Sequence, residues 1–208
     1  MATDWKSKWD ERYRAPEYAY GTEPNKFLAQ QLPQLTPGRI LFAAEGEGRN
    51  AVFAARQGWS VAAFDLSVAG REKAGRLARQ YGVEVDYRVG ELPGLGFSTA
   101  SFDALALIYA HVPPEVRPEY HRLLDTYLKP GGTIILEGFG EHHLPYRERD
   151  PRVGGPRDQE TLFSMEEMRR DFGEYEVRLL EEREVELHEG RYHNGRGSVV
   201  RFIGVKSD

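Results

Sequence analysis

A short turn of alternating acidic residues and glycines is the part of this sequence best suited to chemistry. The turn 45–48, EGEG, follows an apolar run at 40–43, and Asp65 ends a second apolar run that begins at Ser60. A carboxylate at the end of a second strand is placed to accept hydrogen bonds from both ribose hydroxyls of an adenosine. The pattern predicts a βαβ unit that holds a nucleotide cofactor at the carboxyl ends of its strands.

The turn differs from the fingerprint of dinucleotide-binding proteins. That fingerprint is GxGxxG, and here Gly46 and Gly48 are present while Ala51 occupies the third glycine position. Glu45 can neutralise an ammonium group, which would be unwelcome beside a pyrophosphate. We therefore expect an adenosine cofactor with an amino-acid tail, a description that S-adenosylmethionine fits, rather than NAD. The alternative is an ordinary strand-to-helix turn with solvated glutamates.

The hydrophobic pattern indicates the elements that must position these groups. Strands are expected at 40–43, 60–65, 83–89, 102–109 and 133–137, and helices at 50–58, 67–82 and 113–127 alternate with them. Two further strands, at 175–188 and 197–206, form an antiparallel hairpin. The sequence thus predicts an α/β fold with a doubly wound, seven-stranded, mostly parallel sheet and a C-terminal antiparallel hairpin.

The segments on either side of this core are expected to complete a binding site. Trp5, Trp9 and Tyr13 recur at helical spacing, which fits either a lid over the cofactor or a helix packed on the core. Residues 138–159 show no periodicity and are expected to form a polar binding loop. The predicted organisation is one domain, 1–208, with a helical prelude at 1–36 and a core at 37–208.

Composition excludes several classes of function. The chain has 208 residues, a net charge of −5 and no cysteine, so disulfides, thiolate metal sites and thiol nucleophiles are excluded. The negative charge gives no general attraction to nucleic acid. No apolar run approaches the roughly 20 residues that span a bilayer, and the start MATDWKSKWDERY lacks the apolar core of a signal peptide. We expect a cytoplasmic monomer or homodimer that has no membrane or nucleic-acid partner.

Four passages of the sequence carry a resemblance to a known family. They are WDERYRAPEYAYGTEPNKFL, ILFAAEGEGRNAVFAA, SFDALALIYAHVPPEVRPEYHRLLDTYLKPGGTIILEGF, and the late GGP with the terminal hairpin. Together they resemble class I S-adenosylmethionine-dependent methyltransferases of the tellurite-resistance and thiopurine methyltransferase-like group, which have a Rossmann-like fold. Phe42 and Ala44 depart from the general methyltransferase loop DxGxGxG, where Asp and the first Gly stand, and Glu45 is expected to take the acidic role.

The resemblance implies a set of cofactor-binding residues. Glu45, Gly46 and Gly48 are expected to hold the methionine moiety and Asp65 the ribose, with Tyr109 and His111 beneath the sulfonium. Glu91 is expected to contact the adenine amino group, and the alternative is that it is an acidic residue of a solvated loop. For Tyr109 the alternative is an aromatic residue of the core. The full predicted set is Glu45, Gly46, Gly48, Asn50, Asp65, Leu66, Glu91, Leu92 and Tyr109.

The acceptor is expected to be a small molecule. Methyl transfer from a sulfonium needs alignment of the reacting atoms in a dry pocket more than it needs a strong base. A soft acceptor, such as a thiol or a selenium or tellurium oxyanion, needs positive or hydrogen-bonding groups to orient it. His111 and Arg147 are therefore the catalytic candidates. The substrate-binding candidates are Trp9, Tyr13, Tyr20, His142 and Arg149.

The sequence also bears on a metal site and on two other functions. Glu141, His142 and His143 could suggest a metal, but adjacent histidines point to different sides and no further ligand has motif spacing, so no metal is expected. A non-catalytic S-adenosylmethionine-binding protein is one alternative, and it would bind the cofactor without turnover. An NAD-dependent oxidoreductase is the other, and it would need the missing third glycine.

Overall fold

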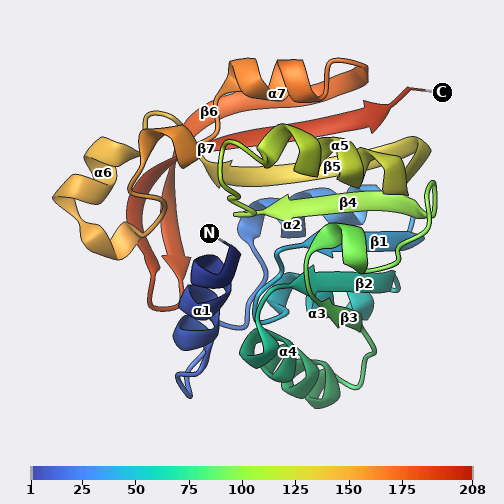
Figure 1. The fold of residues 1–208 in the computed structure, drawn as a ribbon, viewed down its shortest axis with the longest axis horizontal. Coiled ribbons are helices and arrows are strands. Elements are labelled where there is room, and N and C mark those ends of the chain that lie inside the picture. The colour runs from blue at the N-terminus through green and yellow to red at the C-terminus, as the bar shows by residue number, and fades with distance from the viewer. Residues whose placement is uncertain (1, 208) are drawn as a thin grey trace.

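The computed structural model of the chain describes residues 2–207, with side chains from residue 5 onward. Seven strands form one sheet in the order β3-β2-β1-β4-β5-β7-β6, and β7 runs antiparallel to both of its neighbours (Figure 1). The predicted sheet and terminal hairpin are confirmed. The strands are β1 (Arg39–Ala43), β2 (Ser60–Asp65), β3 (Asp86–Val89), β4 (Phe102–Ile108), β5 (Leu128–Phe139), β6 (Tyr175–Glu189) and β7 (His193–Lys206). The outer limits of the predicted domain, residues 1 and 208, lie outside the described residues.

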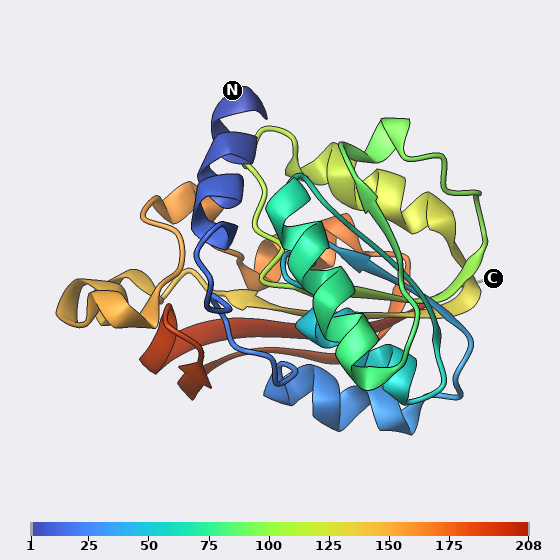
Figure 2. The same cartoon turned by 90° about the horizontal axis from the view of Figure 1, so that it is seen from below.

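Helices cover both faces of the sheet (Figure 2). Helices α5 and α7 contribute to the apolar core on one face, and α2 and α3 contribute to the core on the other. Within residues 2–207, no helix is long and apolar enough to cross a membrane. The helices are α1 (Ala2–Tyr13), α2 (Lys26–Gln31), α3 (Arg49–Arg56), α4 (Val68–Tyr81), α5 (Arg117–Tyr127), α6 (Leu144–Arg149) and α7 (Met165–Asp171).

Burial on both faces explains why the central strands are almost entirely apolar. In β1, Ile40 and Phe42 join the core on one face, while Leu41 and Ala43 join the core on the other. All four side chains are buried. A parallel strand between two layers of helices needs apolar residues at successive positions rather than at alternate ones. This arrangement leaves the carboxyl ends of the strands as the place where polar side chains can gather.

Several predicted elements differ from the structure. Strand β7 begins at His193 and not at 197, and helix α5 begins at Arg117 and not at 113. Strand β3 begins at Asp86 and not at 83, because the amide of Val83 donates to the carbonyl of Ala78 and completes the end of α4. Strand β5 begins early, at Leu128, which pairs with Phe102 across a register shift. The expected loop at 138–159 is wrong in part, since it contains the end of β5, helix α6 and a 3₁₀ turn at Pro151–Val153.

A buried ion pair joins the glycine turn to α4 and to the segment after α1. The ammonium of Lys73 lies 2.6 Å from Oε1 of Glu47 and donates to the carbonyl of Glu17 at 2.6 Å. The other oxygen of Glu47 accepts from the amide of Ala19 at 2.7 Å. Both side chains of the pair are almost fully buried, at 2% and 3% exposure. Glu47 therefore has an internal partner and serves to hold the prelude on the core.

Removing the cation of this pair tests its contribution to stability. We expect Lys73→Met to lower the free energy of unfolding by about 3–5 kcal/mol, because Glu47 then stays buried without its cation. Urea denaturation measures the change. Arg178→Met is the matched control, since Arg178 and Glu176 form an exposed ion pair and its loss is expected to cost less than about 1 kcal/mol. Equal losses in the two variants would contradict the assignment.

Candidate active site

A cavity of about 770 Å³ lies where the carboxyl ends of the central strands meet the prelude. This volume is in the range of sites that hold a cofactor or a small ligand. Trp5, Trp9 and Tyr13 of α1 line one side of it, and Tyr13 is also buried in the core. The aromatic face of α1 therefore lines the cavity and packs on the core through Tyr13, while its role as a lid stays a prediction.

The glycines of the turn make room for other parts of the protein. A Cβ on Gly46 would lie 2.6 Å from the hydroxyl oxygen of Tyr13, and a Cβ on Gly48 would lie 2.4 Å from the Cβ of Ala74. Both glycines have positive φ, and so does Ala44, at 51°, where the general methyltransferase loop has a glycine. Neither Gly46 nor Gly48 is among the described residues that line the cavity. The turn is thus packed tightly between α1 and α4.

Glu45 lines the cavity and also caps the helix that follows it. Oε1 of Glu45 accepts hydrogen bonds from the amides of Asn50, at 2.9 Å, and Ala51, at 2.7 Å, in the first turn of α3. Gly48, at the start of that helix, has no side chain with which to cap it. Burial raises the pKa of Glu45 to about 7, although these amides oppose the shift. Asn50 is fixed in turn, because its side-chain oxygen accepts from the amide of Asn25 at 2.9 Å.

Asp65 lies at the carboxyl end of β2, as predicted. Its two oxygens accept from the amides of Gly46, at 3.0 Å, and Ser67, at 2.9 Å, so the side chain has a fixed orientation. Burial raises the pKa of Asp65 to about 6, and the backbone hydrogen bonds oppose this rise. Each carboxylate oxygen can accept a second hydrogen bond. Leu66, Glu91 and Leu92 line the same part of the cavity, with Glu91 exposed and Leu92 buried.

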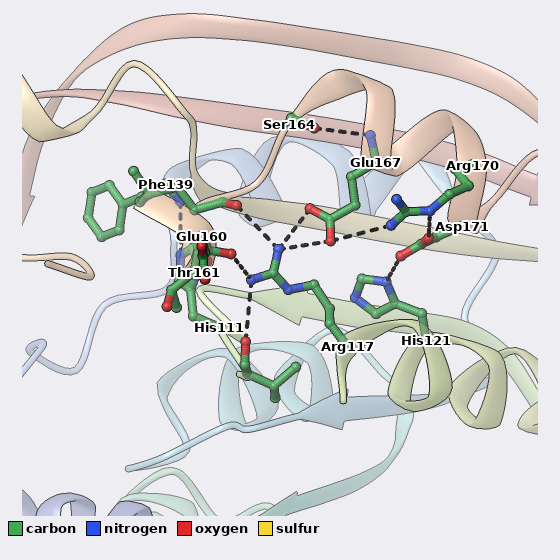
Figure 3. Close-up of polar contacts among 12 residues, drawn as sticks. His111, Arg117, His121, Phe139, Glu160, Thr161, Ser164, Glu167, Arg170 and Asp171 are labelled. Atoms are coloured by element: carbon green, nitrogen blue, oxygen red, sulfur yellow. Dashed lines mark hydrogen bonds and ion pairs between the residues drawn. The ribbon is translucent and has the colours of Figure 1, made fainter. Parts of the chain in front are cut away.

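His111 lines the cavity, but both of its ring nitrogens are occupied (Figure 3). Nε2 accepts from the amide of Phe139 at 3.0 Å, and Nδ1 lies 3.0 Å from the carbonyl oxygen of Thr161. A carbonyl only accepts, so the proton of the neutral ring is on Nδ1. Burial lowers the pKa of His111 to about 3. The ring therefore fixes the end of β5 and has no free nitrogen for a substrate.

Arg117 holds in place the part of the cavity wall that contains Thr161 (Figure 3). This buried arginine of α5 forms an ion pair with Glu167 of α7 at 2.7 Å. It also donates to the carbonyl oxygens of Glu160, at 2.9 Å, and Leu162, at 3.2 Å. These contacts hold both sides of Thr161, which lines the cavity. The position of the wall thus depends on a guanidinium that never reaches the cavity.

Two arginines give another part of the cavity a positive charge. Arg147 of α6 and Arg157 line it, and Arg147 donates to the carbonyl of Gly155 at 3.2 Å. Within the described part of the chain, no acidic side chain forms an ion pair with either guanidinium. Partial burial, and then the charge of Arg157, lower the pKa of Arg147. Arg12 lines the cavity as well and donates to the hydroxyl of Tyr20 at 2.7 Å.

His142 and Arg149 do not line the cavity. Both are exposed, and Nδ1 of His142 lies 2.7 Å from a carboxylate oxygen of Glu182 on β6. His142 and Glu182, together with Glu141, bring three potential ligand atoms within 4.8 Å of one another. The sequence could not indicate this group, because Glu182 is distant along the chain. The absence of a resident metal stays a prediction.

A buried polar cluster beside the cavity was not predicted. Arg49 of α3 lies 2.8 Å from Oε2 of Glu189 at the end of β6, and Nδ1 of His193 lies 3.1 Å from the same oxygen. Asn25 donates to Glu189 at 3.2 Å and to Glu137 at 2.6 Å. Burial alone would raise the pKa of Glu189, but Arg49 and His193 hold it at about 2. The hairpin loop was expected at 189–196, where polar residues suggest solvent exposure, so no pattern pointed to this cluster.

Comparisons with known proteins agree with this geometry. Residues 40–132 match the family of methyltransferase domains, and no curated protein sequence matches the chain. A structure from work on the conversion of a disulfide bond into a thioacetal group in echinomycin biosynthesis is similar, with a TM-score of 0.76 and 16% identity over 98% of this chain and 92% of the other. An S-adenosylmethionine-dependent methyltransferase from Methanosarcina mazei gives 0.69 and 22% over 86% and 97%. TehB from Haemophilus influenzae gives 0.71 and 13% over 97% and 67%.

These likenesses show that the fold is that of class I methyltransferases, as predicted. The family match and the fold together support a methyltransferase and indicate S-adenosylmethionine as its cofactor. The likeness to TehB, at 13% identity, extends to the fold alone, and the narrower resemblance to the tellurite-resistance and thiopurine methyltransferase-like group stays a prediction. The residues at the strand ends fit the cofactor, because Glu45, Asp65 and Glu91 offer the acceptors that an ammonium, a ribose diol and an adenine amino group require.

We expect cofactor binding to depend on pH, because Glu45, the residue predicted to pair with the ammonium of the cofactor, has a raised pKa. Burial raises the pKa of its carboxyl from 4.5 to about 7, so in the free protein it loses its proton only as the pH rises through neutrality. An ammonium group pairs with the ionised form, so affinity for S-adenosylhomocysteine should be about tenfold weaker at pH 6 than at pH 8. Asp65, with a pKa of about 6, acts in the same direction.

Calorimetry at pH 6, 7 and 8 measures this dependence. In Glu45→Gln the dependence between pH 7 and pH 8 should flatten, because the remaining group, Asp65, is already ionised there. Affinity that rises as the pH falls would contradict the pairing of Glu45 with the ammonium.

Proposed function

We propose that this protein transfers a methyl group from S-adenosylmethionine to a small soft nucleophile, which is a thiol or a selenium or tellurium oxyanion. The opposite charges of the two parts of the cavity support this proposal. Carboxylates of Glu45, Asp65 and Glu91 line one part, and the guanidinium groups of Arg147 and Arg157 line another. Arg49 and Asp158 also line the cavity, so each part carries one charge of the opposite sign in addition. A cofactor with a sulfonium and an ammonium is attracted to the first part, and an anionic acceptor is attracted to the second.

The acidic part of the cavity would hold the cofactor, which supplies an electrophilic methyl group when it is bound. Asp65 would accept hydrogen bonds from the ribose hydroxyls, and Glu45 would pair with the ammonium. The ring of Tyr109 lies 4.8 Å from that of Phe139, and both rings line the cavity. Their electron-rich faces suit a cationic sulfur. These groups would bind and orient, and none of them would exchange a proton with the cofactor.

The basic part of the cavity would orient the acceptor. Arg147 is held by the carbonyl of Gly155, which leaves the rest of its guanidinium for a ligand. The indole rings of Trp5 and Trp9 line the cavity near the basic residue Arg12, whose guanidinium lies 5.2 Å from the ring of Trp9. Apolar walls exclude water, and this strengthens the attraction between the guanidinium groups and an anion.

Two rival functions make different demands on the cavity. A dinucleotide carries a pyrophosphate, which the carboxylate of Glu45 beside the glycine turn would repel. A protein that only binds S-adenosylmethionine needs no second, basic part in the cavity. Methylation of an added acceptor separates the proposed enzyme from both rivals.

Substitution of Asp65 tests the cofactor part of the site. We expect Asp65→Asn to weaken S-adenosylhomocysteine binding by about 1.5–3 kcal/mol, because charge-assisted hydrogen bonds to the ribose are lost. Calorimetry measures the change, with Asp86→Asn as the control, since Asp86 is exposed on β3 and does not line the cavity. Undetectable binding of S-adenosylhomocysteine to the wild-type protein at millimolar ligand would refute the proposed function.

Substitution of Arg147 tests the acceptor part. We expect Arg147→Gln to raise the KM for selenite or tellurite about tenfold or more, because a charged hydrogen bond of about 1.5–3 kcal/mol is lost. The matched control is Arg149→Gln, which removes an exposed arginine of the same helix that does not line the cavity. Methyl transfer from radiolabelled cofactor measures both variants. Equal KM values in the two variants would show that Arg147 does not hold the acceptor.

A further inference from the structure

A histidine and a glutamate on the terminal hairpin form a buried pair that reaches the cavity. Glu189 ends β6, His193 begins β7, and the two residues are paired in the sheet. Nδ1 of His193 lies 3.1 Å from Oε2 of Glu189. An ionised carboxylate can only accept, so the proton of a neutral His193 ring must be on Nδ1. The lone pair of Nε2 is then available.

Nε2 of His193 is open to the cavity. His193 lines the cavity, and the only hydrogen bond that its ring forms among the described residues is the one from Nδ1. The described side-chain atoms that are buried without any partner are Nε of Arg117 and Nε2 of His121. Nε2 of His193 is not among them, so this nitrogen is not fully buried, and the residue to which it belongs lines the cavity. Its ring lies against Tyr109 and Tyr20, with a centroid separation of 4.4 Å in each case.

His111, the other histidine that lines the cavity, and His143, which is buried and does not line it, both lack this property. Both nitrogens of His111 are occupied, as described above. In His143, Nε2 lies 3.0 Å from the carbonyl oxygen of Gly154, and Nδ1 accepts from the amide of Ser198 at 3.4 Å. His193 is therefore the one of these three rings whose second nitrogen has no partner in the protein.

Burial, together with two nearby arginines, keeps the ring of His193 neutral, so that Nε2 carries a lone pair and no proton. Burial lowers the pKa of its imidazole, Glu189 opposes this shift, and Arg49 and Arg12 add to it. Once protonated, the ring would be stabilised by Glu189, which Arg49 and Asn25 hold in place. The titratable and charged groups that face His193 are Glu189, Arg49, Arg12, Tyr20, Tyr109, His111 and His143.

We propose that His193, oriented by Glu189, is a general base, and that the acceptor is a thiol. This inference rests on the proposed function and narrows its substrate class. Selenium and tellurium oxyanions react through a lone pair of the central atom and have no proton to lose in the attack. A thiol does, because the thiolate is the nucleophile and a free thiol is mostly protonated at neutral pH.

The proposed step balances in atoms and charge. The thiol proton passes to Nε2 of His193, which becomes an imidazolium paired with Glu189. The thiolate sulfur forms a bond to the methyl carbon as the bond between that carbon and the cofactor sulfur breaks. The electron pair of the broken bond leaves with neutral S-adenosylhomocysteine. The imidazolium then releases its proton to water, and the products are a thioether and a proton.

Labelling of the wild-type protein tests the open nitrogen without any turnover. Diethyl pyrocarbonate acylates neutral imidazole nitrogens that a reagent can reach, and peptide mass spectrometry locates the adducts. We expect modification of His193 together with the exposed His142 and His188, while His111 and His143 stay unmodified. An unmodified His193 in protein whose exposed histidines are fully modified would overturn the proposal.

A pair of thiols tests the proton transfer itself. We expect His193→Gln to slow methylation of benzyl mercaptan, which is protonated at neutral pH, by about 100-fold or more, the usual effect of losing a general base. Methylation of 4-nitrothiophenol, which is already a thiolate at that pH, should change less than about threefold. His188→Gln is the control, since His188 is exposed on the same hairpin and does not line the cavity. Equal slowing of both thiols, or of neither, would overturn the role of His193.

Cofactor binding separates failure of this inference from failure of the proposed function. S-adenosylhomocysteine should bind His193→Gln as it binds the wild-type protein, within about threefold by calorimetry, which also shows that the variant folds. Wild-type protein that binds the cofactor but methylates neither thiol would overturn the thiol assignment and leave cofactor binding intact. Wild-type protein that does not bind the cofactor would overturn the proposed function as well.

Discussion

The ion pair between Arg49 and Glu189 connects the parts of the chain from which the candidate active site is built. Arg49 belongs to the helix after the glycine turn, and Glu189 belongs to the terminal hairpin, which is distant along the sequence. Asn25 joins them from the prelude. Burying two charges is costly, and the attraction between them offsets that cost only when geometry and additional hydrogen bonds are good. Both conditions hold here, so the three segments are held in one arrangement.

That arrangement places opposite charges within a single cavity. Acidic side chains come from the ends of β1 and β2, where main-chain amides orient them, and basic side chains come from α6 and the segment after it. The first group lies on the rigid sheet, and the second lies on segments that connect strands. Such a division lets the sheet hold a cofactor while the connecting segments determine the acceptor. The fold alone does not indicate which acceptor the basic part of the cavity binds.

Much of the sheet could be predicted, and several site residues could not, for physical reasons. The runs of β1 and β4 are apolar because both of their faces are covered, and this pattern is visible in a single sequence. Asp65 was predictable because it ends such a run. Glu189 and His193 were not, because their burial is created by partners on α3 and the prelude. His111 was predicted as a catalytic candidate, yet its nitrogens are used by main-chain groups that no sequence pattern identifies.

The glycine turn also shows how a residue type can be required for a reason other than the expected one. Position 46 has no space for a side chain because the hydroxyl of Tyr13 occupies the place of the missing methyl group. The identity of residue 46 is therefore coupled to the aromatic residue of the first helix. In a protein of this fold whose first helix carried a small residue at that point, position 46 would still favour a residue that adopts a positive φ, but it would have room for a side chain. Sequence variation at these two positions should then occur together.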